Sequence, residues 1–141
     1  MKYLVALILS LTLATPALAA DWDARTRRTN TSVQDADIQN ALAQGLPPQF
    51  AQAFPSKRFG IYVLVDHANV PELGQGVDYI SLGLCKRRPD GSYDLPTATF
   101  STMLPVGNGN ADHERQLAIQ RLIEQSREFA QLMLQNASRI R

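Results

Sequence analysis

The chain has 141 residues, with 14 Lys and Arg against 13 Asp and Glu, and a formal net charge of +1 at pH 7. Proteins that bind nucleic acid usually carry a strong basic excess that neutralises phosphates, so this near balance argues against that class. The single cysteine, Cys85, excludes an intramolecular disulfide and a metal site built from cysteines. Its expected role is a small buried apolar side chain, with a covalent link between two chains as the alternative.

The first 19 residues have the pattern of a secretory signal peptide. Lys2 provides a short basic start, residues 3–13 form an apolar run, and Ala17-Leu18-Ala19 is an A-x-A cleavage sequence. The run is much shorter than the about 20 apolar residues that a membrane-spanning helix needs. We therefore expect cleavage near Ala19, no stable membrane anchor in the mature chain, and a location in the periplasm or outside the cell. Loss of Lys2 also leaves basic and acidic residues balanced at 13 each.

Residues 20–32 are polar and rich in arginine apart from Trp22, which predicts a flexible arm. Trp22 is the one side chain there that could attach the arm to the domain or to a partner. The remainder, 33–141, predicts a single α+β domain.

The first predicted elements are a helix and a strand. A partial apolar stripe predicts a helix over 33–44, with Ser32 as N-cap, Asp35 three residues later, and Gly45 as its C-terminal glycine. A short turn is expected over 49–54. Residues 59–65 are apolar on both faces and rich in β-branched side chains, which is typical of a central strand. Asp66-His67 is expected to end that strand.

A hairpin and a long helix complete the prediction. Strands are expected over 77–87 and 92–104, joined by a type I turn at 88–91, with Pro96 marking an edge strand or a bulge. A long amphipathic helix follows from about 111 to 138, capped by Asn110 or Asp112. The predicted fold is α+β: an N-terminal helix, a three-stranded antiparallel meander, and the long C-terminal helix packed on the sheet.

The catalytic candidates are Asp66, His67, His113 and Glu114. Asp66 and His67 lie at a predicted strand end, but adjacent strand residues point to opposite faces. His113 and Glu114 lie at the start of the long helix, where the helix dipole alone explains a carboxylate. A meeting of His67 with His113 would suggest acid–base chemistry or a metal. No motif predicts a cofactor or a dedicated metal site.

Binding candidates are the basic run Lys86-Arg87-Arg88, which Lys57 and Arg58 are expected to approach, and the residues Leu117, Leu132 and Trp22. A basic hairpin tip can bind an acidic partner, and Leu117 and Leu132 fall outside the apolar stripe of the long helix. The sequence thus favours a small exported protein-binding domain, either an accessory part of an envelope, secretion or conjugation assembly or an inhibitor or immunity-type partner. The alternative is a small periplasmic hydrolase that uses His67 or His113 with a carboxylate. A homodimer through the 112–138 helix or through Cys85 is a further hypothesis.

Overall fold

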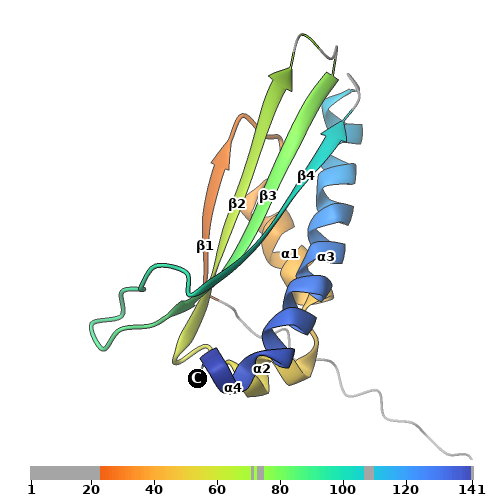
Figure 1. Ribbon diagram of the computed structural model, residues 1–141. Coiled ribbons are helices and arrows are strands. Elements are labelled where there is room, and N and C mark those ends of the chain that lie inside the picture. Colours follow the sequence, from red (N-terminus) through yellow and green to blue (C-terminus); the bar gives the residue numbers. More distant parts are fainter. Residues whose placement is uncertain (1–22, 71, 73–74, 107–109, 141) are drawn as a thin grey trace, which may run out of the picture.

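A computed structural model describes residues 23–70, 72, 75–106 and 110–140 (Figure 1). The elements follow the order β1 (Ala24–Thr29), α1 (Asp35–Gly45), α2 (Pro48–Ala53), β2 (Phe59–Val70), β3 (Gln75–Lys86), β4 (Ala98–Val106), α3 (Ala111–Gln135) and α4 (Ala137–Ile140). The strands form one sheet in the order β1-β2-β3-β4, with β1 parallel to β2 and the other pairs antiparallel. Figure 1 shows the helices together on one face of this sheet, so the molecule has two layers.

The α+β class and the long C-terminal helix are confirmed, but the three-stranded meander is wrong because the sheet has four strands. The fourth is β1, which pairs with β2 from Ala24↔Ile61 to Thr29↔Asp66. The prediction of a flexible arm over 20–32 is therefore wrong for Ala24–Thr29, which form a strand. An edge strand takes its hydrogen bonds from one neighbour and can leave charged side chains in water, so β1 needs no apolar run of its own.

The first helix begins later than expected, at Asp35, with Gln34 rather than Ser32 as its N-cap. The backbone N–H of Gln34 donates to Asp37 at 2.8 Å, which satisfies one donor at the helix start. Gly45 belongs to the helix and is not in the left-handed conformation of a C-terminal glycine. It is needed for a close contact with α3 instead.

The central strands are longer than predicted, since Asp66 and His67 continue β2 rather than end it. The turn at 88–91 is confirmed: Gly91 has φ 83° and its N–H donates to Arg88 at 2.9 Å. The strand expected over 92–104 begins only at Ala98. Residues 87–97 form a projecting segment, here named the hairpin loop.

The core lies between the sheet and the helices. Alternate residues of β2 and β3 point toward the helices and are buried: Ile61, Val63, Val65, Ile80, Leu82 and Leu84. Helix α3 covers them with Ala118, Leu122, Phe129, Ala130 and Met133, as its stripe predicted. The 25 residues of α3 span ~37 Å at about 1.5 Å per residue. The 12-residue strands β2 and β3 span ~40 Å at about 3.3 Å per residue, so the helix can lie along the sheet without projecting beyond it.

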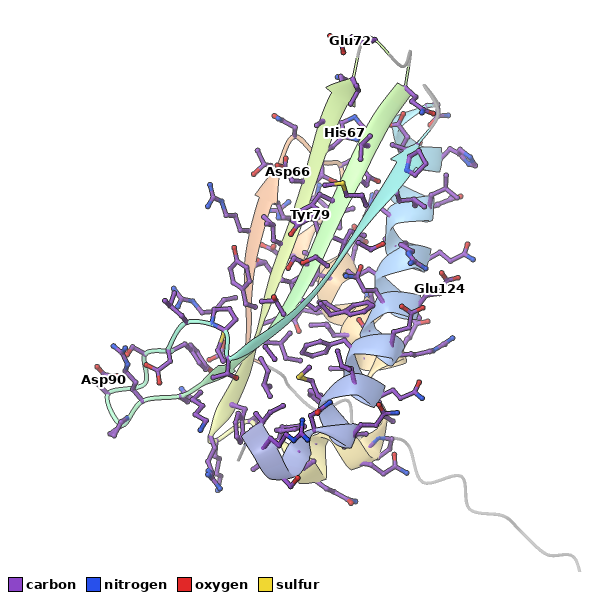
Figure 2. All side chains as sticks on the ribbon, viewed as in Figure 1. Asp66, His67, Glu72, Tyr79, Asp90 and Glu124 are labelled. Atoms are coloured by element: carbon purple, nitrogen blue, oxygen red, sulfur yellow. The ribbon has the colours of Figure 1, made fainter. Side chains whose placement is uncertain are left out.

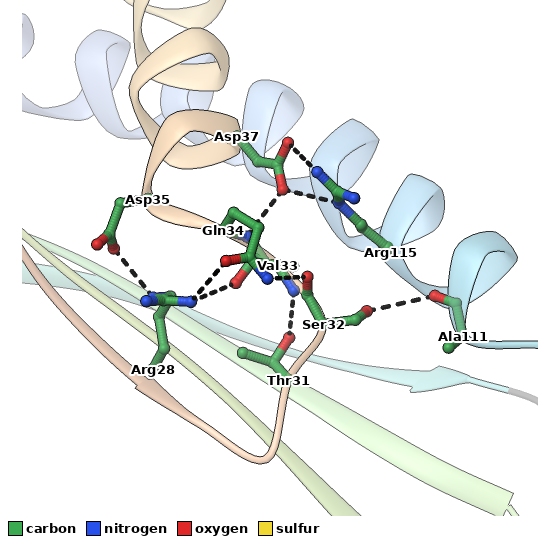
Figure 3. A network of polar contacts seen from close by, with 9 residues as sticks. All are labelled: Arg28, Thr31, Ser32, Val33, Gln34, Asp35, Asp37, Ala111 and Arg115. Carbon is green, nitrogen blue, oxygen red and sulfur yellow. Dashed lines mark hydrogen bonds and ion pairs between the residues drawn. The ribbon is translucent and has the colours of Figure 1, made fainter.

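Polar contacts join the start of α1 to β1 and α3 (Figure 3). Arg115 of α3 makes two hydrogen bonds to the carboxylate of Asp37, at 2.8 and 2.9 Å. Arg28 of β1 donates to the backbone carbonyl of Val33 at 2.9 Å and pairs with Asp35 at 2.9 Å. These contacts hold the connection between β1 and α1, of which residues 30–32 line the pocket described next.

Candidate functional sites

His67 lies near the C-terminal end of β2 and pairs in register with Asp78 of β3. By strand alternation both residues are on the helix-facing side of the sheet, in line with the buried apolar residues of their strands. Asp78 is only 3% exposed. A Cβ atom on Gly76 would lie 2.5 Å from the His67 ring, so glycine at that position leaves room for the imidazole.

The imidazole of His67 is held at both nitrogens. Nδ1 lies 2.8 Å from Oδ1 of Asp78, and Nε2 lies 3.3 Å from Oδ1 of Asn69. The hydrogen bond with Asp78 raises the pKa of His67 above its usual value, against the opposing effect of burial; Asn69 and the charge of Glu114 add to the rise. Two acceptor oxygens on one ring favour the imidazolium, in which both nitrogens donate.

His67 and Asp78 open onto a pocket of about 150 Å³ that Glu114 also lines. The opposite wall is the β1–α1 connection, where Asn30 adopts a left-handed φ of 52°. A histidine oriented by a buried carboxylate is an arrangement that acid–base catalysts use. Within the described ranges, no three His, Cys, Asp or Glu side chains are placed to hold a metal ion.

The structure brings together two of the four catalytic candidates, His67 and Glu114. Asp66 is on the opposite face of the sheet, as strand alternation requires, and Figure 2 labels it beside His67. His113 is exposed on α3 and is not among the residues that line the pocket. The partner of His67 is Asp78, which sequence reasoning missed. Its signal was a carboxylate in phase with Ile80, Leu82 and Leu84, on the apolar face of its strand.

A second site, here named the basic hollow, lies at the other end of the sheet. It has a volume of about 270 Å³ and is lined by Lys57, Arg58, Phe59, Lys86, Arg87, Arg88 and Pro89. The expected approach of Lys57 and Arg58 to the basic run is confirmed. It follows from register, because Phe59 pairs with Lys86 and the N–H of Arg87 donates to Arg58 at 2.8 Å.

Five of the 14 basic residues of the chain therefore surround one hollow. In the part of the chain that the structure describes, only Arg88 among these five has an ion pair, with Asp94 at 2.6 Å. Arg58 lies over the ring of Phe59 and Arg87 over the ring of Tyr93, at 5.6 and 5.7 Å from the ring centroids. These stacking contacts orient the guanidinium groups without neutralising them.

Of the remaining binding candidates, the structure describes two. Leu117 is half-buried and Leu132 is 39% exposed, both on α3, while Trp22 lies outside the described residues. Cys85 is buried, at 3% exposed, and burial raises the pKa of its thiol. A buried, protonated thiol forms disulfides poorly, so its burial disfavours the covalent link between chains. A separate apolar groove of about 650 Å³ lies where Leu46 and Pro47 face Leu134 of α3.

No protein-family model, curated protein or solved structure matches this chain. Among the described helices, none has the length and apolar character needed to cross a membrane.

Proposed function

We propose that this chain is an exported protein-binding domain whose basic hollow receives an acidic segment of a partner protein. The observation that carries the proposal is the convergence of five cations from two separate chain segments around one hollow, four of them without an ion pair within the described residues. Unpaired charge of one sign around a concave surface attracts groups of the opposite sign and accelerates their association. The near-neutral net charge makes this a local feature of the molecule.

An acidic protein segment fits the hollow better than a nucleic acid. A nucleic acid presents a regular line of phosphates and is usually met by a basic stripe along a whole face. Here the cations gather at one end, whereas acidic side chains, including Asp66, Glu72 and Asp112, lie toward the other end of the strands and of α3. The partner fits either proposed role: a component of an envelope, secretion or conjugation assembly, or a toxin or hydrolase that the domain neutralises. We propose export because residues 1–19 have the pattern of a signal peptide.

The test uses the fact that Lys57 and Lys86 are the only lysines after Lys2. Tagged chain is incubated with an envelope extract of the source organism, and a carbodiimide joins carboxylates to lysine amines that touch them. We expect one stoichiometric partner, coupled at Lys57 or Lys86 through an Asp- or Glu-rich peptide. Because the double variant K57E/K86E lacks these amines, its capture is compared with that of wild type by affinity pull-down without carbodiimide, and it should not retain the partner. Arg127→Glu is the matched control, because it reverses an exposed charge on α3 away from the hollow. Equal capture by wild type and K57E/K86E would reject the proposal.

A second candidate, a small hydrolase, is favoured by one observation, the His67–Asp78 pair opening onto a pocket that Glu114 lines. It ranks below binding because Nε2, the ring nitrogen left for a substrate when Nδ1 contacts Asp78, already lies 3.3 Å from Asn69. Ester and peptide substrates should be screened with wild type, His67→Gln and His113→Gln. Turnover that disappears only in His67→Gln would establish this candidate instead.

A further inference from the structure

The hairpin loop carries the most exposed large hydrophobic side chain of the described residues. Leu95 is 87% exposed, compared with 71% for Met103 and 39% for Leu132. Figure 1 shows the loop extending away from the sheet and the helices, and Figure 2 places Asp90 at its tip. Leu95 follows directly on Asp94, the residue that pairs with Arg88 at the rim of the basic hollow.

The backbone on both sides of Leu95 is fixed. The N–H of Asp94 donates to Lys86 at 2.9 Å, and the N–H of Thr97 donates to Leu84 at 2.8 Å. The hydroxyl of Tyr93 donates to Asp23 at 2.6 Å, which joins the loop to the start of β1. The side chain of Asp90 accepts from the backbone and hydroxyl of Ser92. A loop that is ordered before it binds loses little conformational entropy on association.

From these observations we infer that Leu95 is the apolar anchor of the interface and enters an apolar pocket with an acidic rim on the partner protein. The inference rests on the proposed function, because the basic hollow supplies the charge that the rim complements. A projecting, ordered loop requires a concave surface on its partner, and an apolar side chain that fills a pocket is the usual centre of a protein interface.

An anionic membrane is the other surface that attracts basic and apolar side chains together, and the loop suits it poorly. Stable membrane binding needs more apolar surface than one leucine offers, since even a single fatty acyl chain binds marginally. The observations therefore favour a protein pocket.

The experiment places photoreactive benzoylphenylalanine at position 95 or, as the matched control, at position 103, and illuminates the full-length chain in the same envelope extract. Residue 103 is also apolar and exposed, but it lies on the open sheet face. We expect cross-linking from position 95 alone, to a partner peptide with apolar residues next to Asp or Glu. Leu95→Ser should lower capture of that partner roughly tenfold to a hundredfold, as for a central anchor, and Met103→Ser should not. Both sites are exposed, so both variants should melt at the wild-type temperature.

The outcomes separate the two proposals. Capture by Leu95→Ser within twofold of wild type, together with loss of capture by K57E/K86E, would overturn the anchor and leave the proposed function standing. Equal capture by wild type and K57E/K86E, or no partner at all, would overturn both. Sedimentation with phosphatidylglycerol vesicles that depends on Leu95 would replace the protein pocket by a lipid surface.

Discussion

Gly45 and Ser126 are packed so closely that a Cβ atom added to Gly45 would lie 2.4 Å from the Cβ of Ser126. The same atom would lie 2.7 Å from the backbone oxygen of Ile123, which a side-chain rotation cannot move. The last turn of α1 therefore packs backbone against backbone on α3. We expect Gly45→Ala to force the two helices apart and lower the free energy of unfolding by about 1–3 kcal/mol, measured by urea denaturation.

Two variants test the origin of that loss. Gln44→Ala changes an exposed neighbour in the same helical turn and should stay within about 0.5 kcal/mol of wild type. Ser126→Gly removes the clashing Cβ, so it should lower the free energy of unfolding less in the Gly45→Ala background than in wild type. Strictly additive effects of the two substitutions would contradict the steric explanation.

Gln125 is fully buried on α3 and reaches into the sheet. Its amide donates to the backbone carbonyls of Ile80 at 3.0 Å and Phe100 at 3.1 Å, on neighbouring strands. Gln125→Met keeps the length of the side chain but removes the donor, so we expect a loss of about 1–3 kcal/mol in the free energy of unfolding. Gln116→Met, at an exposed position of the same helix, should change it little. A loss equal to that of the control would mean that the two hydrogen bonds do not stabilise the fold.

Three features of the structure could be predicted, wholly or in part, from the sequence. The apolar stripe of α3 was predictable because residues three and four apart share one face of a helix, and the turn at 88–91 because Pro89 and Gly91 suit it. The basic hollow was partly predictable, since a strand that starts after Lys57-Arg58 and one that ends at Lys86 bring those residues together if they pair antiparallel.

The features that the sequence did not predict also have physical causes. The β1 strand has no local signal, because Arg25, Arg27 and Arg28 interrupt any apolar pattern and its order comes from pairing with β2. The His67–Asp78 contact depends on strand register, and a slip of one residue would place Asp78 on the other face. Gln125 and Ser126 are polar residues on the buried face of α3, and only their backbone acceptors explain their burial.

The contact between Asp37 and Arg115 should make stability depend on pH in acid. The hydrogen bonds from Arg115, supported by the backbone of Gln34, hold the pKa of Asp37 below its usual 3.8. A carboxyl group with a lowered pKa in the folded state stabilises the fold above its unfolded pKa, and this contribution disappears as pH falls through the folded pKa. Asp37→Asn should therefore lower the urea midpoint at neutral pH, and the difference from wild type should shrink below about pH 3.8. A constant difference at every pH would show that the charge is not responsible.

Tyr93 should ionise at an unusually high pH. Burial, the hydrogen bond to Asp23 and the charge of that carboxylate raise the pKa of Tyr93 to about 12. An ultraviolet titration of phenolate absorbance should contain a step near pH 12 that disappears in Tyr93→Phe, while circular dichroism shows that the fold persists. Asp23→Asn should move this step to lower pH. A late step that survives in Tyr93→Phe would assign it to another tyrosine.

The pair of His67 and Asp78 should make stability fall as pH rises through the neutral range, which is opposite in sign to the dependence expected for Asp37. The pKa of His67 is raised above 6.5 in the folded protein, first of all by its hydrogen bond with Asp78. A base with a raised pKa contributes fully to stability below its unfolded pKa, and the contribution is lost as pH rises through the folded value. Loss of the imidazolium also leaves Asp78, which is 3% exposed, as a buried carboxylate without a cation.

We expect the unfolding midpoint of wild type to exceed that of His67→Gln most at pH 6 and progressively less toward pH 9. His113→Gln should keep the wild-type pH dependence, because His113 is exposed and outside the pocket. A difference between wild type and His67→Gln that does not change with pH would mean that the pair is held by hydrogen bonding alone, without the ionic contribution.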